Sequence, residues 1–200
     1  MEDQSQHKPP SFKYIEIPKE FHSYSKGGLF ERCIMCDRNL LESGEHYMIE
    51  KAIKSYPDYS AKDVIFEYAI CISCAMKMRN ELSSETLSRI DQYMARNIDL
   101  SSRKHLMEQE EINIENWLGN CLITGKSKDE LEEYQLYAHC FGDKMVCSEM
   151  PYMISGQVLY EVGELLSKQS QDELDGFKDQ YFGLPPELKD LIGPKDVILL

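Results

Sequence analysis

The chain has 200 residues, of which 42% are hydrophobic and 28% are charged, a globular composition with room for one ordinary domain or two small ones. Its apolar runs are only a few residues long, whereas a membrane-spanning helix needs about 20 apolar residues. The N-terminal segment MEDQSQHKPPS is polar and lacks the apolar stretch of a secretory signal. We therefore expect a soluble, cytoplasmic protein with no membrane partner.

The net charge of −13 is concentrated in residues 101–200, which hold 9 Lys and Arg against 19 Asp and Glu. Affinity for nucleic acid comes largely from cations that neutralise phosphates, so this balance disfavours a nucleic-acid partner. We expect a protein partner instead. A nucleic-acid-binding regulator stays open as an alternative, because five cations of the first half could cluster: Lys51, Lys54, Lys62, Lys77 and Arg79.

Residues 1–28 form an N-terminal arm. Its first 11 residues are polar and contain Pro9 and Pro10, so we expect this stretch to be mobile. The patch Tyr14–Ile17 follows with partial alternation of apolar and polar side chains, which predicts an edge strand.

Four of the seven cysteines form two pairs with the spacing Cys-x-x-Cys. Two thiolates separated by two residues can turn toward one ion, and two such pairs supply the four sulfur ligands of a tetrahedral zinc site. Thiolates are soft ligands that favour zinc over hard cations. The sequence therefore predicts one structural zinc ion per chain, held by Cys33, Cys36, Cys71 and Cys74. An iron–sulfur cluster and a redox dithiol are the alternatives.

Strand and helix patterns accompany both pairs. After the first pair, Ser43-Gly44 predicts a turn, and the alternation from Tyr47 to Lys51 predicts a strand, so this pair begins a hairpin. The β-branched and aromatic residues 64–70 predict a second strand. Helix formers follow from Met76, and helical spacing continues to Met94, so the second pair is expected to open a helix.

This order of elements resembles the treble-clef zinc finger over roughly residues 29–95. The resemblance rests on the motifs CIMC and CISC, although Ile34 and Asp37 stand where such knuckles often carry Pro and Gly. It implies an α+β fold built on a zinc-bound hairpin, strand and helix. Treble clefs serve as nucleic-acid binders, ubiquitin-ligase modules, nucleases and structural supports, so the resemblance does not select one function.

A bridging segment, residues 98–117, is predicted to be helical in part, and Trp117 is expected to pack between the two halves. Residues 118–200 then resemble a degenerate second copy of the zinc module, which spans residues 29–97. Phe30–Cys36 aligns with Leu118–Thr124 at an offset of 88, and Cys71–Cys74 aligns with Met153–Gly156 at an offset of 82.

In this alignment the four ligand positions become Cys121, Thr124, Met153 and Gly156, so the second unit is expected to bind no metal. Its expected core consists of Tyr134, Leu136, Tyr137, Val158, Leu159, Val162, Leu165 and Leu166. Pro186 predicts a short helix over Glu187–Ile192, before an apolar C-terminal tail that packs or contacts a partner.

An alternative second zinc site would use Cys121, His139, Cys140 and Cys147. Their spacing does not favour it, because His139 and Cys140 are adjacent and would point to opposite faces of a strand. We expect Cys140 and Cys147 to pack in the core instead.

The sequence contains no glycine-rich nucleotide-binding loop and no His-Glu-x-x-His motif, and its five histidines lack spacing for general-base work. Four thiolates would also fill the coordination sphere of zinc and leave no position for a reactive water. We therefore expect a non-enzymatic zinc-binding protein that acts as an interaction or scaffold module. A redox-responsive zinc switch is a further alternative, because oxidation of the thiolates would expel zinc.

Overall fold

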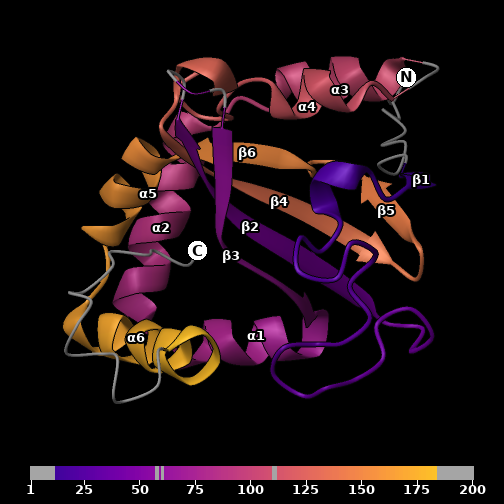
Figure 1. The fold of residues 1–200 in the computed structure, drawn as a ribbon. Coiled ribbons are helices and arrows are strands. Elements are labelled where there is room, and N and C mark those ends of the chain that lie inside the picture. Colours follow the sequence, from indigo (N-terminus) through magenta and orange to yellow (C-terminus); the bar gives the residue numbers. More distant parts are fainter. Residues whose placement is uncertain (1–11, 57–58, 60, 110–111, 184–200) are drawn as a thin grey trace, which may run out of the picture.

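The structure is a computed structural model that describes residues 12–56, 59, 61–109 and 112–183. The segment predicted to be mobile (1–11), the helix predicted over 187–192 and the apolar tail lie outside these residues. The fold is mixed α/β, with a central antiparallel sheet (Figure 1). Among the described residues, no helix is long and apolar enough to cross a membrane.

In the described part of the chain, six strands form this sheet: five lie in the order β1-β5-β4-β2-β3, and β6 pairs with β4. The predicted edge strand corresponds to β1, and the two strands predicted around the cysteine pairs correspond to β2 and β3. The strands are β1 (Lys13–Glu16), β2 (His46–Tyr56), β3 (Ala61–Cys71), β4 (Glu133–Phe141), β5 (Lys144–Cys147) and β6 (Tyr152–Ser155).

The helical pattern predicted from Met76 to Met94 is interrupted. The first helix ends at Glu81, and the Ser83 hydroxyl caps the next one by accepting a hydrogen bond from the backbone N–H of Thr86 at 3.1 Å. The helices are α1 (Ile72–Glu81), α2 (Ser84–Asn97), α3 (Ser101–Glu108), α4 (Ile114–Leu118), α5 (Gly156–Gly163) and α6 (Lys168–Phe182). The 3-10 helices whose residues are all described are η1 (Lys19–Phe21) and η3 (Lys128–Glu130).

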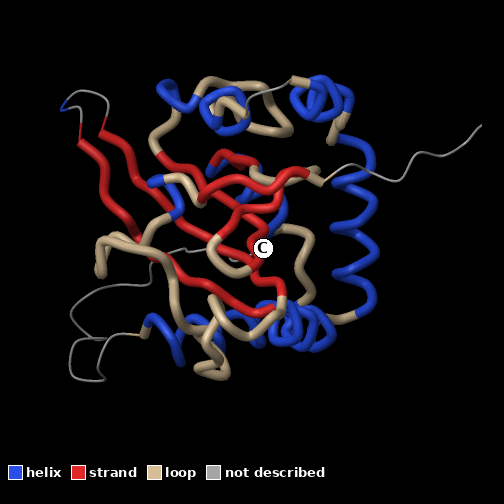
Figure 2. The backbone as a smooth tube through the Cα atoms, turned by 90° about the vertical axis from the view of Figure 1, so that its right-hand side faces the viewer, coloured by secondary structure: helices blue, strands red, loops and turns tan. Residues whose placement is uncertain are grey.

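The core lies on both faces of the sheet, and Figure 2 shows the strands enclosed by helices on several sides. On one face Tyr68 contacts Phe177 of α6, with ring centroids 5.8 Å apart. Trp117 is 1% exposed and lies in the hydrophobic core. Of the predicted core of the second half, six residues are buried, and Leu165 and Leu166 are half-buried: the buried ones are Tyr134, Leu136, Tyr137, Val158, Leu159 and Val162.

The pairing of β2 with β4 joins the two halves of the chain. These strands run antiparallel from His46 opposite Phe141 to Lys54 opposite Glu133. The predicted zinc module and the predicted second unit therefore share one sheet.

A buried ion pair fastens the N-terminal arm to the other face of the sheet. Lys51 Nζ lies 3.1 Å from a Glu67 carboxylate oxygen and donates to the carbonyl of His22 at 2.5 Å. The same carboxylate accepts hydrogen bonds from the backbone N–H groups of Tyr24 and Ser25 and from the Ser23 hydroxyl. Burial acts to raise the pKa of Glu67, but these hydrogen bonds outweigh it and lower the pKa.

Glu50 lies at the middle of the β2–β4 pairing, opposite Tyr137. Its side chain accepts a hydrogen bond from the Tyr68 hydroxyl at 2.5 Å, and its other oxygen has no hydrogen-bond partner among the described residues. Burial raises the pKa of Glu50 to about 8, although the Tyr68 hydrogen bond acts in the opposite direction. Glu50 is therefore largely protonated at neutral pH.

Glu67→Gln should lower the free energy of unfolding by about 3 kcal/mol, because it leaves the Lys51 ammonium buried without a counter-charge. The loss should shrink as the pH falls below the ordinary glutamate pKa of 4.5, since a carboxylate with a lowered pKa stabilises the fold only while it stays ionised. Urea unfolding measures both effects. Glu133→Gln is the matched control: it breaks the exposed pair with Lys54, so stability should hardly change. Equal losses of stability in the two variants would contradict the role of Glu67 as the counter-charge of a buried Lys51.

Glu50→Gln should remove a pH dependence. In the native chain the folded state keeps a proton on Glu50 that the unfolded state releases near pH 4.5, so stability should fall as the pH rises from about 5 to about 8. A difference of one pKa unit is worth about 1.4 kcal/mol, so the fall should reach a few kcal/mol. Glutamine stays neutral and should flatten the curve. Urea unfolding at both pH values tests this, and parallel curves for the two proteins would refute it.

Candidate metal centre

The first cysteine pair lies in the loop between η1 and β2. The backbone N–H of Cys33 donates to the carbonyl of Arg38 at 3.0 Å, and that of Asp37 donates to the carbonyl of Cys33 at 2.9 Å. Asp37 has a φ of +56°, in the left-handed region that favours glycine. The chain thus makes a tight turn at the position where zinc knuckles often carry Gly, and Asp is among the few other residues that tolerate this conformation.

The second pair lies where β3 passes into α1. Cys71 is the last residue of β3 and the N-cap of α1, and Cys74 lies in the first turn of that helix. The N-terminal end of a helix carries partial positive charge, which favours thiolates near it. The helix predicted to open at the second pair is therefore present at this position.

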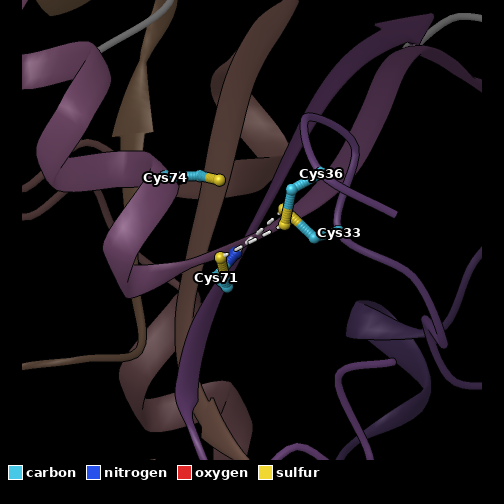
Figure 3. Close-up of side chains that lie close together, drawn as sticks. All are labelled: Cys33, Cys36, Cys71 and Cys74. Atoms are coloured by element: carbon cyan, nitrogen blue, oxygen red, sulfur yellow. Dashed lines mark hydrogen bonds between the residues drawn. The ribbon is translucent and has the colours of Figure 1, made fainter. Parts of the chain in front are cut away.

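The four sulfur atoms lie within 4.8 Å of one another and are directed toward a common region (Figure 3). The sulfurs of Cys36 and Cys71 are 3.8 Å apart, and the backbone N–H of Cys71 donates to the Cys33 sulfur at 3.4 Å. Four sulfurs at about 2.3 Å from a tetrahedral ion would be separated by about 3.8 Å. The group could hold a metal ion, and it is the only such group of three or more His, Cys, Asp or Glu side chains in the described part of the chain.

Exposure and charge differ among the four thiols. Cys33 and Cys71 are buried, Cys74 is half-buried and Cys36 is exposed. Burial acts to raise the pKa of Cys33, but hydrogen bonds led by the one from the Cys71 backbone lower it to about 7. Burial and the neighbouring thiols raise the pKa values of Cys71 and Cys74. Four thiolates therefore need a cation among them, and binding of the cation must release protons.

A polar contact outside the thiols holds the second pair. Glu45, just before β2, accepts a hydrogen bond from the backbone N–H of Ser73 at 2.8 Å and a second one from its hydroxyl. Arg38 forms an ion pair with the same carboxylate. Sequence reasoning missed Glu45, because no spacing motif links it to Ser73.

The loop before β4 has the same backbone hydrogen bonds as the first cysteine loop. The N–H of Cys121 donates to the carbonyl of Lys126 at 2.9 Å, and that of Gly125 donates to the carbonyl of Cys121 at 2.9 Å. Gly125 has a φ of +69°. The Cys121 sulfur accepts a hydrogen bond from the backbone N–H of Ser155 at 3.3 Å.

Ser155 therefore makes the contact with Cys121 that Cys71 makes with Cys33. Strand register agrees: Tyr134 lies opposite Ser155 as Tyr47 lies opposite Cys71. Ser155 is also the N-cap of α5. The sequence alignment paired Cys71 with Met153 at an offset of 82, whereas these contacts and this register pair Cys71 with Ser155 at an offset of 84, at which Val158, and not Gly156, corresponds to Cys74.

The alternative ligand set does not come together in the described part of the chain. Cys121 contacts Ser155, whereas His139 packs against His46 with ring centroids 4.7 Å apart. Cys140 and Cys147 are fully buried, and burial raises their pKa values to about 12 and about 11. Both pack in the core, as predicted.

Comparison with known proteins adds no assignment: no family model matches this chain, and no curated protein or solved structure matches it.

Proposed function

We propose that this chain is a structural zinc protein built from two copies of one treble-clef-like unit, of which only the first binds metal. We further propose that it acts as a protein-interaction module and not as an enzyme. The observation that carries the proposal is the group of four thiols from two loops that are distant in the sequence. Soft thiolate ligands favour zinc, and a set of four leaves no coordination position for a reacting water.

Strand register supports the two-copy proposal. In the first half Tyr47 lies opposite Cys71 and Ile49 opposite Ala69. In the second half the corresponding pairs are Tyr134 with Ser155 and Leu136 with Met153. The contact between knuckle and strand is repeated too, since Ile34 N donates to the carbonyl of Ala69 and Leu122 N to that of Met153, both at 2.9 Å.

The helices support it as well. Ser83 caps α2 and Ser167 caps α6, at the same offset of 84. The Ser83 N–H donates to the Ser170 hydroxyl at 3.0 Å, and the Ser167 N–H donates to the Thr86 hydroxyl at 2.8 Å. Each half thus supplies a hydroxyl to the other in a reciprocal exchange. Such an exchange is expected between two equivalent units related by a two-fold axis.

On this proposal three of the four ligands have been replaced in the second unit. Cys33 is matched by Cys121, whereas Thr124, Ser155 and Val158 stand where the first unit has Cys36, Cys71 and Cys74. The Cys121 thiol is 2% exposed and hydrogen-bonded to Ser155, and Val158 is fully buried. Hydrogen bonds and apolar packing take the place of the metal.

A protein partner is favoured over nucleic acid by the state of the candidate cations. Lys51 is 4% exposed and paired with Glu67. Lys54 is paired with Glu133, and Arg79 with Asp91. Three of the five cations that could have bound phosphates are therefore neutralised within the chain, and the net charge is −13.

Cys36→Ser should lower the zinc content from one ion per chain to well below one and should destabilise residues 29–97, because metal-binding energy in such sites is folding energy. Cys121→Ser should leave the zinc content at one. Elemental analysis of protein purified without chelator measures this, with thermal unfolding beside it. Cys36 is exposed and Cys121 is buried, so a purely structural effect of the substitution should be larger at Cys121. Loss of zinc in the Cys36 variant alone would therefore identify Cys36 as a ligand. Unchanged zinc in the Cys36 variant, or loss of zinc in the Cys121 variant, would refute the site.

The variant T124C/S155C/V158C should bind a second zinc ion, because it restores three thiols around Cys121. The variant T124C/M153C/G156C is the matched control and should still bind one, since it places two of its three new thiols at the positions given by the offset of 82. Zinc content and circular dichroism of both variants test the proposal. One zinc ion in a folded T124C/S155C/V158C protein would count against equivalence of the two units.

A further inference from the structure

A cavity of about 330 Å³ lies between the sheet and helices α1 and α2. The space is partly open to solvent, because Met76 in its lining is 50% exposed, so a ligand could enter it. Its volume falls within the range of pockets that bind small molecules. The cysteine site and the proposed zinc do not account for it.

Apolar side chains from several elements line the cavity. Met48 comes from β2, Met78 from α1 and Met94 from α2. Methionine is unbranched and flexible, so walls of this kind can adapt to different apolar shapes. The lining predicts a ligand that is mainly hydrocarbon.

The wall also contains one unused hydrogen-bonding group. Tyr137 and Tyr152 both line the cavity, with ring centroids 5.1 Å apart. The Tyr137 hydroxyl donates to the side-chain oxygen of Gln135, whereas the Tyr152 hydroxyl has no hydrogen-bond partner among the described residues. Burial raises the pKa of Tyr152 to about 12, so this hydroxyl keeps its proton and can donate it. A few polar groups in an apolar wall are what orients a ligand in such pockets.

The lining carries no unpaired charge. Its two charged residues, Arg79 of α1 and Asp91 of α2, form an ion pair at 3.0 Å. The guanidinium is thus already matched by a carboxylate from the neighbouring helix. The carboxylate of a fatty acid would have to displace Asp91 to pair with Arg79, whereas a neutral molecule would not.

We propose that this cavity binds an uncharged, mainly apolar molecule that carries one hydrogen-bond acceptor, which the Tyr152 hydroxyl recognises. Hydrocarbon contacts with the methionines supply most of the affinity. The hydrogen bond from Tyr152 orients the polar end of the molecule. A medium-length alcohol has this chemistry.

The test is a titration of the full-length protein with the uncharged fluorescent probe N-phenyl-1-naphthylamine, followed by displacement with 1-decanol or decanoate. The probe should bind and 1-decanol should displace it at lower concentration than decanoate. Tyr152→Phe should weaken the binding of 1-decanol about threefold to tenfold and leave the affinity for the probe unchanged, because only the alcohol forms a hydrogen bond with the Tyr152 hydroxyl. Tyr160→Phe is the matched control, since Tyr160 is 65% exposed on α5 and lies outside this cavity.

Ala75→Phe fills the cavity from α1 and should abolish probe binding, with circular dichroism to show that the variant is folded. If a folded Ala75→Phe protein bound the probe as before, the cavity would not be the binding site. Stronger displacement by decanoate would overturn the uncharged class of ligand. Equal effects of Tyr152→Phe and Tyr160→Phe would overturn the role of Tyr152.

Discussion

The pairing of β2 with β4 is the contact on which the rest of the arrangement depends. It is antiparallel over nine residue pairs, and it makes one sheet from strands that belong to different halves of the chain. A buried backbone N–H or C=O that loses its partner is costly, so the halves cannot separate while the sheet is covered. The cysteine cluster at the end of β3, the arm held by Lys51 and the cavity beneath α1 and α2 all take their positions from this sheet.

On the proposed duplication, the second unit indicates what stabilises a zinc-knuckle turn after its metal has been lost. The turn itself survives without four thiols, because backbone hydrogen bonds and a left-handed residue define it in both loops. The remaining sulfur, Cys121, is satisfied by the N–H of Ser155, as Cys33 is by the N–H of Cys71. Small units ordinarily need a metal or a disulfide as a staple. A unit that shares a sheet with a metal-bound neighbour can instead draw stability from that interface.

Local features were predictable from the sequence, and non-local ones were not. The spacing of Cys33 and Cys36, and of Cys71 and Cys74, is a local signal that selected four side chains the structure brings together. The strands before and after these pairs were also readable, because their alternation is local. The partner of β2 was not, since no residue in β2 encodes pairing with β4. On the proposed duplication the same holds for the alignment of the two halves: the offset of 82 matched Ile-Ser with Ile-Ser, whereas strand register, which no local pattern shows, matches Cys71 with Ser155.

The cavity follows from the same geometry. On the proposed duplication, α1 and α2 meet α5 and α6 around an approximate two-fold axis that passes near Glu50 and Tyr137. Side chains near such an axis come in equivalent pairs, and the cavity lining contains two of them, Leu82 with Leu166 and Ile90 with Leu174. A larger side chain on one side of the axis would clash with its equally large counterpart on the other side. Equivalent side chains of ordinary size therefore tend to leave a space at the axis. On this proposal the apolar space is a structural consequence of the pairing of two copies, and the Tyr152 hydroxyl in its wall supplies the polar contact that the proposed ligand requires.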